Sequence, residues 1–379
     1  MRKTLFLLVS LLSMTIVSCS DDASPQESDK PIISPTENIK GIYVMCEGNW
    51  GSNNASIDYL NLATLEYTQN IFTKSNPEVV MGLGDTSSDM QINGNQLWVV
   101  VNNSNKVEVL SVETCKRIAK IDIPNCRYVT FHNDYAYISS YVGPMANDNV
   151  QLGTIYKIDT KDFQKFDSVV VGYQPEEMAI SGSKLYVACS GGYRYPVYDR
   201  VISVVDLTSF KKITDIDVEL NLHRLRKDSH NQLWVTSRGN YSDIGPSLTW
   251  LTPDKTGNMS VAGKIDIAVS DMCIVGDSLY YIGVEWDYAT NSNNISYGII
   301  NTLTHKKVTT TIFNNDAFKN IEVPYGIMVN PKERDFYITD AKNYISSGKL
   351  YHFSAEGTLL WEQWTSDIPS KMAFYTADK

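Results

Sequence analysis

Charged and hydrogen-bonding side chains stand directly before a hydrophobic position that recurs along the chain. In the clearest copy, Glu176 and Glu177 precede Met178. The position directly before the hydrophobic residue is occupied, copy by copy, by Asp89, Tyr128, Glu177, Arg224, Asp271, Gly326 and Lys371. The position before that is occupied by Ser88, Arg127, Glu176, His223, Ser270, Tyr325 and Ser370. Gathered in one place, such groups can bind a polar ligand, or they can pair with one another in a neutral, purely structural network. The sequence leaves both interpretations open.

Long segments rich in Tyr, Trp, Arg and Asn form a second group of candidates. They span residues 47–54, 141–149, 191–200, 238–243, 285–288 and 340–344. A tight turn between strands needs only two to five residues, so the extra length and this composition are typical of a binding surface. From both groups we predict these ligand-binding residues: Trp50, Arg127, Tyr141, Tyr193, Arg194, Tyr195, Arg224, Tyr241, Trp286, Tyr288, Tyr325 and Tyr344.

The sequence fits the residue patterns of known catalytic sites less well than it fits a binding surface. Asp89, Glu177 and Asp271 could imitate the acidic groups with which some lactonases hold calcium, but basic residues at neighbouring positions oppose a cation. Arginines in three consecutive copies suggest a sialidase triad, yet the Asp-box repeats of sialidases are missing. The chain has no Gly-x-Ser-x-Gly or His-Glu-x-x-His motif. We therefore predict a protein that is not an enzyme, with no catalytic residue, no metal site and no cofactor.

A unit of four predicted strands must position these residues. Its first strand reads Pro-x-x-Met-x-Ile at 175–180 and its second reads Leu-Tyr-Val at 185–187. Related first strands lie at 269–274 and 369–374, and looser copies centre on Met90, Val129, Leu225 and Ile327. The six steps from the first copy to the last cover 282 residues, an average of 47. This period predicts an all-β fold, a seven-bladed β-propeller with four antiparallel strands per blade.

The repeat is cut so that the two ends of the chain complete each other. The first unit, starting at Gly41, lacks a first strand, and the chain ends with a lone first strand at 369–374. Pairing of these ends would close the ring and remove its exposed edges. We predict one propeller domain over 41–379. First strands surround the axis of a propeller, so the charged positions should lie at one mouth of its channel. We call the face that carries this mouth and the long segments the upper face.

Composition narrows the class of partner. The net charge is −10 and the pI is about 5.1, which disfavours nucleic acid and anionic membrane surfaces. Beyond the N-terminal region five cysteines remain, an odd number, with no Cys-x-x-Cys pair. Small buried hydrophobic residues are the leading interpretation of these cysteines, and a disulfide involving Cys126 is an alternative.

The N-terminus reads as an export signal. Arg2 and Lys3 precede a short apolar run that ends in Ile-Val-Ser-Cys at 16–19, which resembles a bacterial lipobox. We predict a signal peptide at 1–18, lipidation of Cys19 and a disordered tether at 19–40 that is rich in Ser, Pro, Asp and Glu. The membrane would then be reached only through the N-terminal lipid. Ser-Asp-Asp at 20–22 resembles the surface-export signal of Bacteroidetes lipoproteins.

The strand motifs, the lipobox and the Ser-Asp-Asp signal together resemble the YncE-like seven-bladed propeller surface lipoproteins of Bacteroidetes. The resemblance covers nearly all of 41–379. That group includes the BtuG lipoproteins, which capture cobalamin (vitamin B12) and pass it to a TonB-dependent outer-membrane transporter. The resemblance thus implies an outer-membrane, surface-exposed protein with cobalamin as bound ligand. A glycan-binding accessory lipoprotein, a lactonase-type or lyase enzyme and a structural partner of a transporter remain as alternatives.

Overall fold

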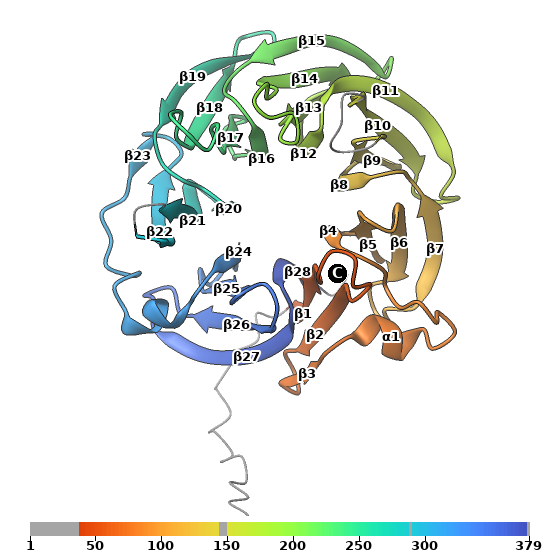
Figure 1. Cartoon of the computed structure of the whole chain (residues 1–379), viewed down its shortest axis with the longest axis vertical. Coiled ribbons are helices and arrows are strands. Elements are labelled where there is room, and N and C mark those ends of the chain that lie inside the picture. The colour runs from red at the N-terminus through yellow and green to blue at the C-terminus, as the bar shows by residue number, and fades with distance from the viewer. Residues whose placement is uncertain (1–37, 144–149, 288–289, 377–379) are drawn as a thin grey trace, which may run out of the picture. The chain divides into compact units, whose positions relative to one another are not determined.

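The computed structural model describes residues 38–143, 150–287 and 290–376, and residues 33–379 form one compact unit. This unit contains seven sheets of four antiparallel strands, arranged as blades around a central axis (Figure 1). The predicted fold class is therefore confirmed. The predicted signal peptide, Cys19 and all but the last residues of the tether lie outside the described residues. Within the described part of the chain, no helix has the length and apolar character needed to cross a membrane.

Each blade is one sheet whose strands follow one another from the axis outward. The inner strands are β4 (Ser87–Asn93), β8 (Cys126–His132), β12 (Pro175–Ser181), β16 (Leu222–Lys227), β20 (Asp271–Val275), β24 (Pro324–Val329) and β28 (Pro369–Thr376). The second strands are β1 (Ile39–Cys46), β5 (Gln96–Val101), β9 (Tyr135–Ser140), β13 (Lys184–Cys189), β17 (Leu233–Ser237), β21 (Ser278–Asp287) and β25 (Phe336–Asp340).

The outer half of each blade completes the sheet. The third strands are β2 (Ser56–Asn61), β6 (Lys106–Ser111), β10 (Leu152–Asp159), β14 (Val201–Asp206), β18 (Ser247–Pro253), β22 (Ser292–Asn301) and β26 (Ser347–Phe353). The fourth strands are β3 (Glu66–Thr68), β7 (Arg117–Asp122), β11 (Lys165–Tyr173), β15 (Lys211–Asp217), β19 (Met259–Ile265), β23 (Lys306–Lys307) and β27 (Leu359–Asp367). The described residues add a short helix α1 (Ile71–Ser75) and a 3-10 helix η1 (Asp316–Asn320).

The ring closes between the two ends of the chain, as the cut repeat predicts. β28 pairs antiparallel with β1, so that Ile42 faces Phe374 and Val44 faces Met372. Strand β1 is hydrogen-bonded to β28 along one edge and to β2 along the other, so the pairing that closes the ring lies within residues 39–376. Strand β1 itself starts at Ile39, two residues before Gly41.

Burial decreases from the second strand to the outer strand of each blade. β5 reads Gln-Leu-Trp-Val-Val-Val and is buried over its last five residues, since its aromatic and β-branched side chains pack between blades on both faces of the sheet. The fourth strand β15, by contrast, is exposed over six of its seven residues. The hydrophobic core is thus a series of layers between neighbouring blades, and the blades hold one another in place.

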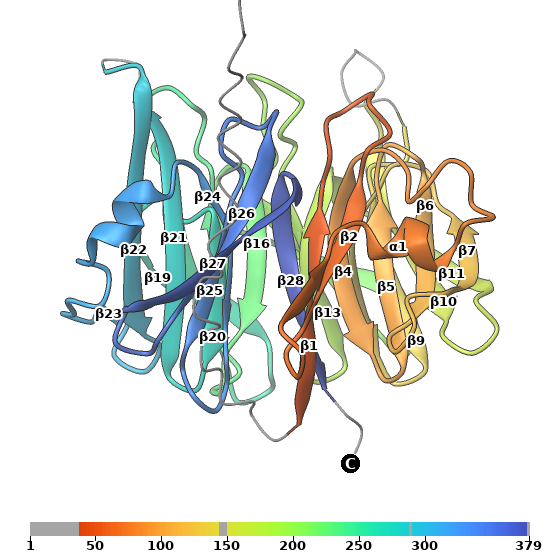
Figure 2. The same cartoon turned by 90° about the horizontal axis from the view of Figure 1, so that it is seen from below.

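The two faces of the ring differ. The predicted tight turns of the lower face are present: Gly94, Gly182 and Gly276 each take a positive φ of 57–59° between an inner and a second strand. On the upper face, the ten-residue strands β21 and β22 form a long hairpin that extends to the top of the ring in Figure 2. The connections on the upper face therefore project further from the ring than the tight turns of the lower face.

Six of the seven inner strands begin with an extra residue. Their pairing with the second strand shifts register near the upper end, for example between Pro175 and Met178, where two residues face one. Such a bulge turns two consecutive side chains toward the axis instead of one. This is why the paired positions before the recurring hydrophobic residue, such as Glu176 and Glu177, both reach the channel mouth.

Candidate functional site

Three carboxylates at the channel mouth join neighbouring blades. Asp89 accepts the backbone N–H of Val129 at 3.0 Å, and Glu177 accepts that of Leu225 at 2.9 Å. Asp271 accepts the N–H of Ile327 at 3.2 Å in the same way. Each carboxylate therefore ties its own inner strand to the inner strand of the next blade. This structural role explains why acids recur at the position before the hydrophobic residue.

Basic side chains neutralise this layer. Glu177 pairs with Lys371 at 3.0 Å, with Arg224 at 3.5 Å and with Arg226. Burial acts to raise the pKa of Glu177, but the charges of Arg226, Lys371 and Arg224 outweigh it and hold the pKa well below its usual range. Arg224 also pairs with Asp271 at 3.2 Å. The charged layer is thus a paired network that joins blades across the channel.

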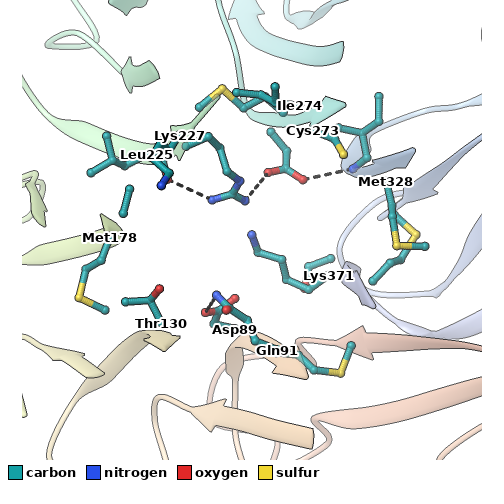
Figure 3. A pocket seen from close by; sticks show the side chains of 18 of the residues that line it. Asp89, Gln91, Thr130, Met178, Leu225, Lys227, Cys273, Ile274, Met328 and Lys371 are labelled. Carbon is teal, nitrogen blue, oxygen red and sulfur yellow. Dashed lines mark hydrogen bonds and ion pairs between the residues drawn. The ribbon is translucent and has the colours of Figure 1, made fainter. Parts of the chain in front are cut away.

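A cavity of about 570 Å³ lies on the axis below this layer. Figure 3 shows the ammonium group of Lys371 directed toward the middle of this cavity, with Asp89 and Gln91 on one side. The walls come from residues two places further along the inner strands, including Thr130, Cys273 and Met328. Because Arg226, Asp271 and Lys371 in its lining are already ion-paired, the axial cavity is a poor candidate for the ligand site.

Glu176 organises a second network just above the layer. Arg127 contacts it at 3.3 Å, the Tyr141 hydroxyl donates to it at 2.6 Å, and Arg238 lies 3.5 Å away. Burial acts to raise the pKa of Glu176, but Arg127 and then Arg238 lower it below its ordinary value. Tyr141 is buried. Two predicted ligand-binding residues, Arg127 and Tyr141, therefore contact Glu176 beneath the surface of the channel mouth.

A cavity of about 590 Å³ on the upper face lies between blades five and six and reaches to the axis. Its volume is in the range of small-molecule sites. Four predicted residues come together around it: Arg224, Tyr241, Trp286 and Tyr325. The sequence did not single out His223, Arg238 or Glu285 as site residues, although they also line it. Arg238 and Glu285 could have been found from their segments, which were already candidates.

Hydrogen bonds at the floor of the cavity fix the form of His223. Arg224 donates to the Tyr128 hydroxyl at 3.2 Å, and that hydroxyl lies 2.8 Å from Nε2 of His223. Burial, together with Arg238 and Arg224, lowers the pKa of His223 well below its ordinary value, so the ring is neutral. The Tyr128 oxygen could accept from both Arg224 and an Nε2–H group, but the buried hydroxyl proton would then have no acceptor among the described residues. Donation from Tyr128 to Nε2 satisfies this proton, and it puts the proton of the neutral ring on Nδ1.

One wall of the cavity is a loop held in place by Asn240. Its side-chain oxygen accepts the N–H groups of Ser242 at 3.0 Å and Ile244 at 2.9 Å, and its amide donates to Asp243 at 2.7 Å. The loop presents Tyr241, whose side chain is 60% exposed and packs edge-to-face on Tyr198 of the neighbouring blade, with ring centroids 6.4 Å apart. Tyr241 is thus a largely pre-positioned apolar surface.

The facing wall comes from the β21–β22 hairpin. Trp286 lies near the end of β21 opposite Asn293 and is 46% exposed. Tyr325 closes the side nearest the axis, with its hydroxyl donating to Glu47 at 3.2 Å. Burial raises the pKa of Glu47, although Arg127 and Arg224 act to lower it. The cavity therefore combines aromatic walls with a polar, cationic floor.

The other predicted residues lie around this cavity or apart from it. Tyr193 packs edge-to-face on Tyr141 and Tyr195 does so on Tyr198, while Arg194 stacks on the Tyr173 ring at 3.6 Å. Trp50 and Tyr344 belong to the loops of blades one and seven, and Tyr344 packs against Tyr325. Tyr288 lies outside the described residues. The binding role of all twelve residues stays a prediction.

The structure gives no candidate for a metal centre in the part of the chain that it describes, since no three His, Cys, Asp or Glu side chains there gather as ligands. The five cysteines from Cys46 to Cys273 are free thiols, and four of them are buried. Burial raises the pKa of Cys126 and Cys189 to about 12, so these thiols are protonated. They act as small hydrophobic residues, the leading interpretation from the sequence.

Several solved structures share the fold of this chain but only a small part of its sequence. A quinonprotein alcohol dehydrogenase-like protein from Bacteroides thetaiotaomicron has a TM-score of 0.60 at 11% identity, covering 89% of this chain and 79% of that one. A protein proposed as a 6-phosphogluconolactonase from Bacteroides uniformis has a TM-score of 0.55 at 11% identity, covering 89% and 100%. Apo AztD from Citrobacter koseri has a TM-score of 0.50 at 11% identity, covering 88% and 83%. At this identity the likeness shows the fold alone.

Family membership is shown by a match over most of the chain. No curated protein sequence matches this one. Residues 40–367, which span the ring from β1 to the last outer strand β27, match the family model described as Domain of unknown function (DUF5074). The propeller described above is therefore a member of the DUF5074 family.

Proposed function

We propose that this propeller is a ligand-capture protein that binds one small molecule in the upper cavity and does no chemistry on it. The observation that carries the proposal is the cavity of about 590 Å³ between Tyr241 and Trp286. Large flat side chains that stay exposed in a concave site are typical of ligand binding. The support for binding without reaction is that, among the described residues, Glu285 is the one carboxylate lining the cavity, at its exposed rim.

Cobalamin is the leading ligand under this proposal, because the sequence resembles lipoproteins that capture it. Cobalamin is a flat ring edged by amide groups. Its ring edge suits the aromatic walls formed by Tyr241 and Trp286, and its amides suit the polar floor near Arg238. Since the cavity holds only part of so large a molecule, the loops around it must supply the remaining contacts.

One observation favours a glycan as the second candidate. Tyr195, Tyr198 and Tyr241 form a row of edge-to-face rings, with centroids 6.2 and 6.4 Å apart, that leads from the cavity toward blade four. Tyr195 and Tyr241 are exposed on either side of the buried Tyr198, so these two rings can stack against separate sugars of an extended chain. The two ligands are thus distinguished by whether binding depends on the cavity alone or on the row as well.

The test is titration of residues 33–379 with cyanocobalamin by calorimetry. We expect one-to-one binding that weakens at least about a hundredfold, ~2.7 kcal/mol, when Tyr241 and Trp286 are both replaced by Ala. Trp364→Ala is the matched control, because Trp364 is an exposed tryptophan on β27, outside the cavity. Unchanged affinity in the double variant would exclude the cavity, and absence of heat with cyanocobalamin would move the glycan to first place.

We further propose that the chain is anchored in the outer membrane through lipidated Cys19 and delivers its ligand to a TonB-dependent transporter. The support is the lipobox resemblance of residues 16–19 and the acidic residues that follow. Cys19→Ala should abolish incorporation of labelled palmitate and release the protein from the membrane fraction. A variant that remains membrane-bound and labelled would contradict the anchor.

A further inference from the structure

We propose that the upper cavity contains an oxyanion subsite, in which Arg238 and His223 bind a phosphate or carboxylate carried by a ligand with a flat apolar part. This inference rests on the proposed binding function and specifies the chemical class of its ligand. It depends on two donors at the floor of the cavity whose side-chain N–H groups make no hydrogen bond to the described protein groups, although one of them has an ion contact with Glu176.

The first donor group is the guanidinium of Arg238. Its protein partner among the described residues is Glu176 at 3.5 Å, an ion contact too long and poorly aligned to count as a hydrogen bond. The Glu176 carboxylate is meanwhile occupied by the Tyr141 hydroxyl at 2.6 Å and by Arg127 at 3.3 Å. Arg238 lines the cavity with its side chain 31% exposed. A guanidinium presents five N–H donors in a planar fork that matches a carboxylate or phosphate.

The second donor is Nδ1 of His223. The contacts of Tyr128 assign the ring proton to this atom, since Nε2 receives the tyrosine hydroxyl at 2.8 Å. The described residues provide no hydrogen-bond acceptor for Nδ1, and His223 lines the same cavity as Arg238. One charged and one neutral donor from blade five therefore line the same cavity, and under the proposal they share one acceptor group.

The surroundings favour an anion over a cation. Arg224 adds a third basic side chain to the cavity lining, whereas the acidic lining among the described residues is limited to Glu285. The anchoring positions are rigid: Ser237 donates to the Leu220 carbonyl at 2.6 Å, and the N–H of Arg238 donates to the Asn221 carbonyl at 3.1 Å. The aromatic walls stand directly beside these donors, so an oxyanion attached to a flat ring fits both features at once.

The test uses three probes that share one ring: 2-naphthyl phosphate, 2-naphthoate and neutral 2-naphthol. Binding to residues 33–379, which include every strand of the ring, is followed by fluorescence anisotropy. We expect at least one anionic probe to bind about tenfold more tightly than naphthol, and to weaken as NaCl rises from 50 to 500 mM. The phosphate and carboxylate arms decide which oxyanion the subsite prefers.

Variants locate the subsite. Arg238→Gln should bring the anionic probes to the affinity of naphthol, while naphthol itself is unaffected. Lys264→Gln is the control, because Lys264 is an exposed cation on β19 of the same blade, pairs with Glu219 and Asp266, and does not line the cavity. If Arg238→Gln does not fold, Arg238→Lys, which keeps the charge and loses the fork, should still weaken the anionic probes. Equal binding of naphthol and both anions, or anion binding that Lys264→Gln removes and Arg238 variants retain, overturns the subsite.

Parallel titration with cyanocobalamin separates this inference from the proposed function. Arg238-dependent binding of the anionic probes without any cobalamin binding would support the subsite and refute cobalamin as ligand. Cobalamin binding without preference for the anionic probes would support the proposed function and refute the subsite. Cobalamin itself carries one phosphodiester, so if both proposals hold, Arg238→Gln should weaken cobalamin binding as well.

Discussion

At the scale of single residues, one side chain at the channel mouth contacts two other blades. Glu177 accepts a backbone N–H from the next blade and pairs with Lys371 from the closing strand β28, on the far side of the channel. A buried carboxylate is stable only when its charge is compensated, and three basic groups supply that compensation. The mouth is therefore held shut by electrostatics as well as by packing.

Replacing Glu177 should be costly. Glu177→Gln leaves Arg224, Arg226 and Lys371 with one partner fewer, and we expect a loss of about 3 kcal/mol in the free energy of unfolding at pH 7, measured by urea denaturation. Asp122→Asn is the control, because its pair with Lys120 is exposed and should contribute under about 1 kcal/mol. A loss as small as that of the control would contradict the role of Glu177.

The same pair of proteins gives a pH test. The folded-state pKa of Glu177 is depressed, so its stabilisation is complete above the unfolded value of about 4.3 and is lost as pH falls toward the folded value. The difference in unfolding free energy between the wild type and Glu177→Gln should therefore be constant from pH 6 to 7.5 and shrink below about pH 4. A difference that grows on acidification would contradict the depressed pKa.

At the scale of elements, the upper cavity depends on loops that are organised before any ligand arrives. The Asn240 side chain holds the loop that presents Tyr241, and the β21–β22 hairpin presents Trp286. The sequence identified both segments from their length and composition. It could not show that these two segments line the same cavity, or that Tyr141 is buried. Both depend on the three-dimensional conformation of each loop, which length and composition do not determine.

Loosening the loop should weaken binding without touching the ligand. Asn240 does not line the cavity, so Asn240→Ala removes only the hydrogen bonds that order the loop. We expect the dissociation constant of the tightest naphthyl probe to rise about tenfold, since ordering must then occur on binding. Asn258→Ala removes a hydrogen bond to Thr256 in the loop between β18 and β19, away from the cavity, and should leave the dissociation constant unchanged. Equal affinities in the two variants would contradict pre-organisation of the Tyr241 loop.

Periodicity carried most of the information about the inner strands. The recurring hydrophobic position located each of them, and the polar positions before it do meet at the mouth. Arg226, two residues after Arg224, also reaches the axis, which strand alternation alone could have predicted. The bulges that bring Glu176 and Glu177 to the mouth together have no clear signature in a single sequence, because they depend on the pairing register of two strands.

At the scale of the whole molecule, ring closure should decide whether the domain folds. Ending the chain at Ile368 removes β28, which exposes the edge of β1 and takes away the Lys371 partner of Glu177. We expect this truncated protein to lose its cooperative thermal transition and to self-associate, as seen by circular dichroism and light scattering. A chain ending at Thr376 keeps β28 and is the control. A monomeric truncated protein with an unchanged melting temperature would contradict the importance of closure.

The position of β1 has a mechanical consequence. The chain enters the ring through β1, and β1 is hydrogen-bonded along one edge to β28 and along the other to β2. A pull on the preceding segment acts along the strand, so the hydrogen bonds of both ladders must slide and break together and cannot be peeled apart one by one. Whatever load reaches the propeller through its N-terminal segment is thus shared by the two strands that flank β1.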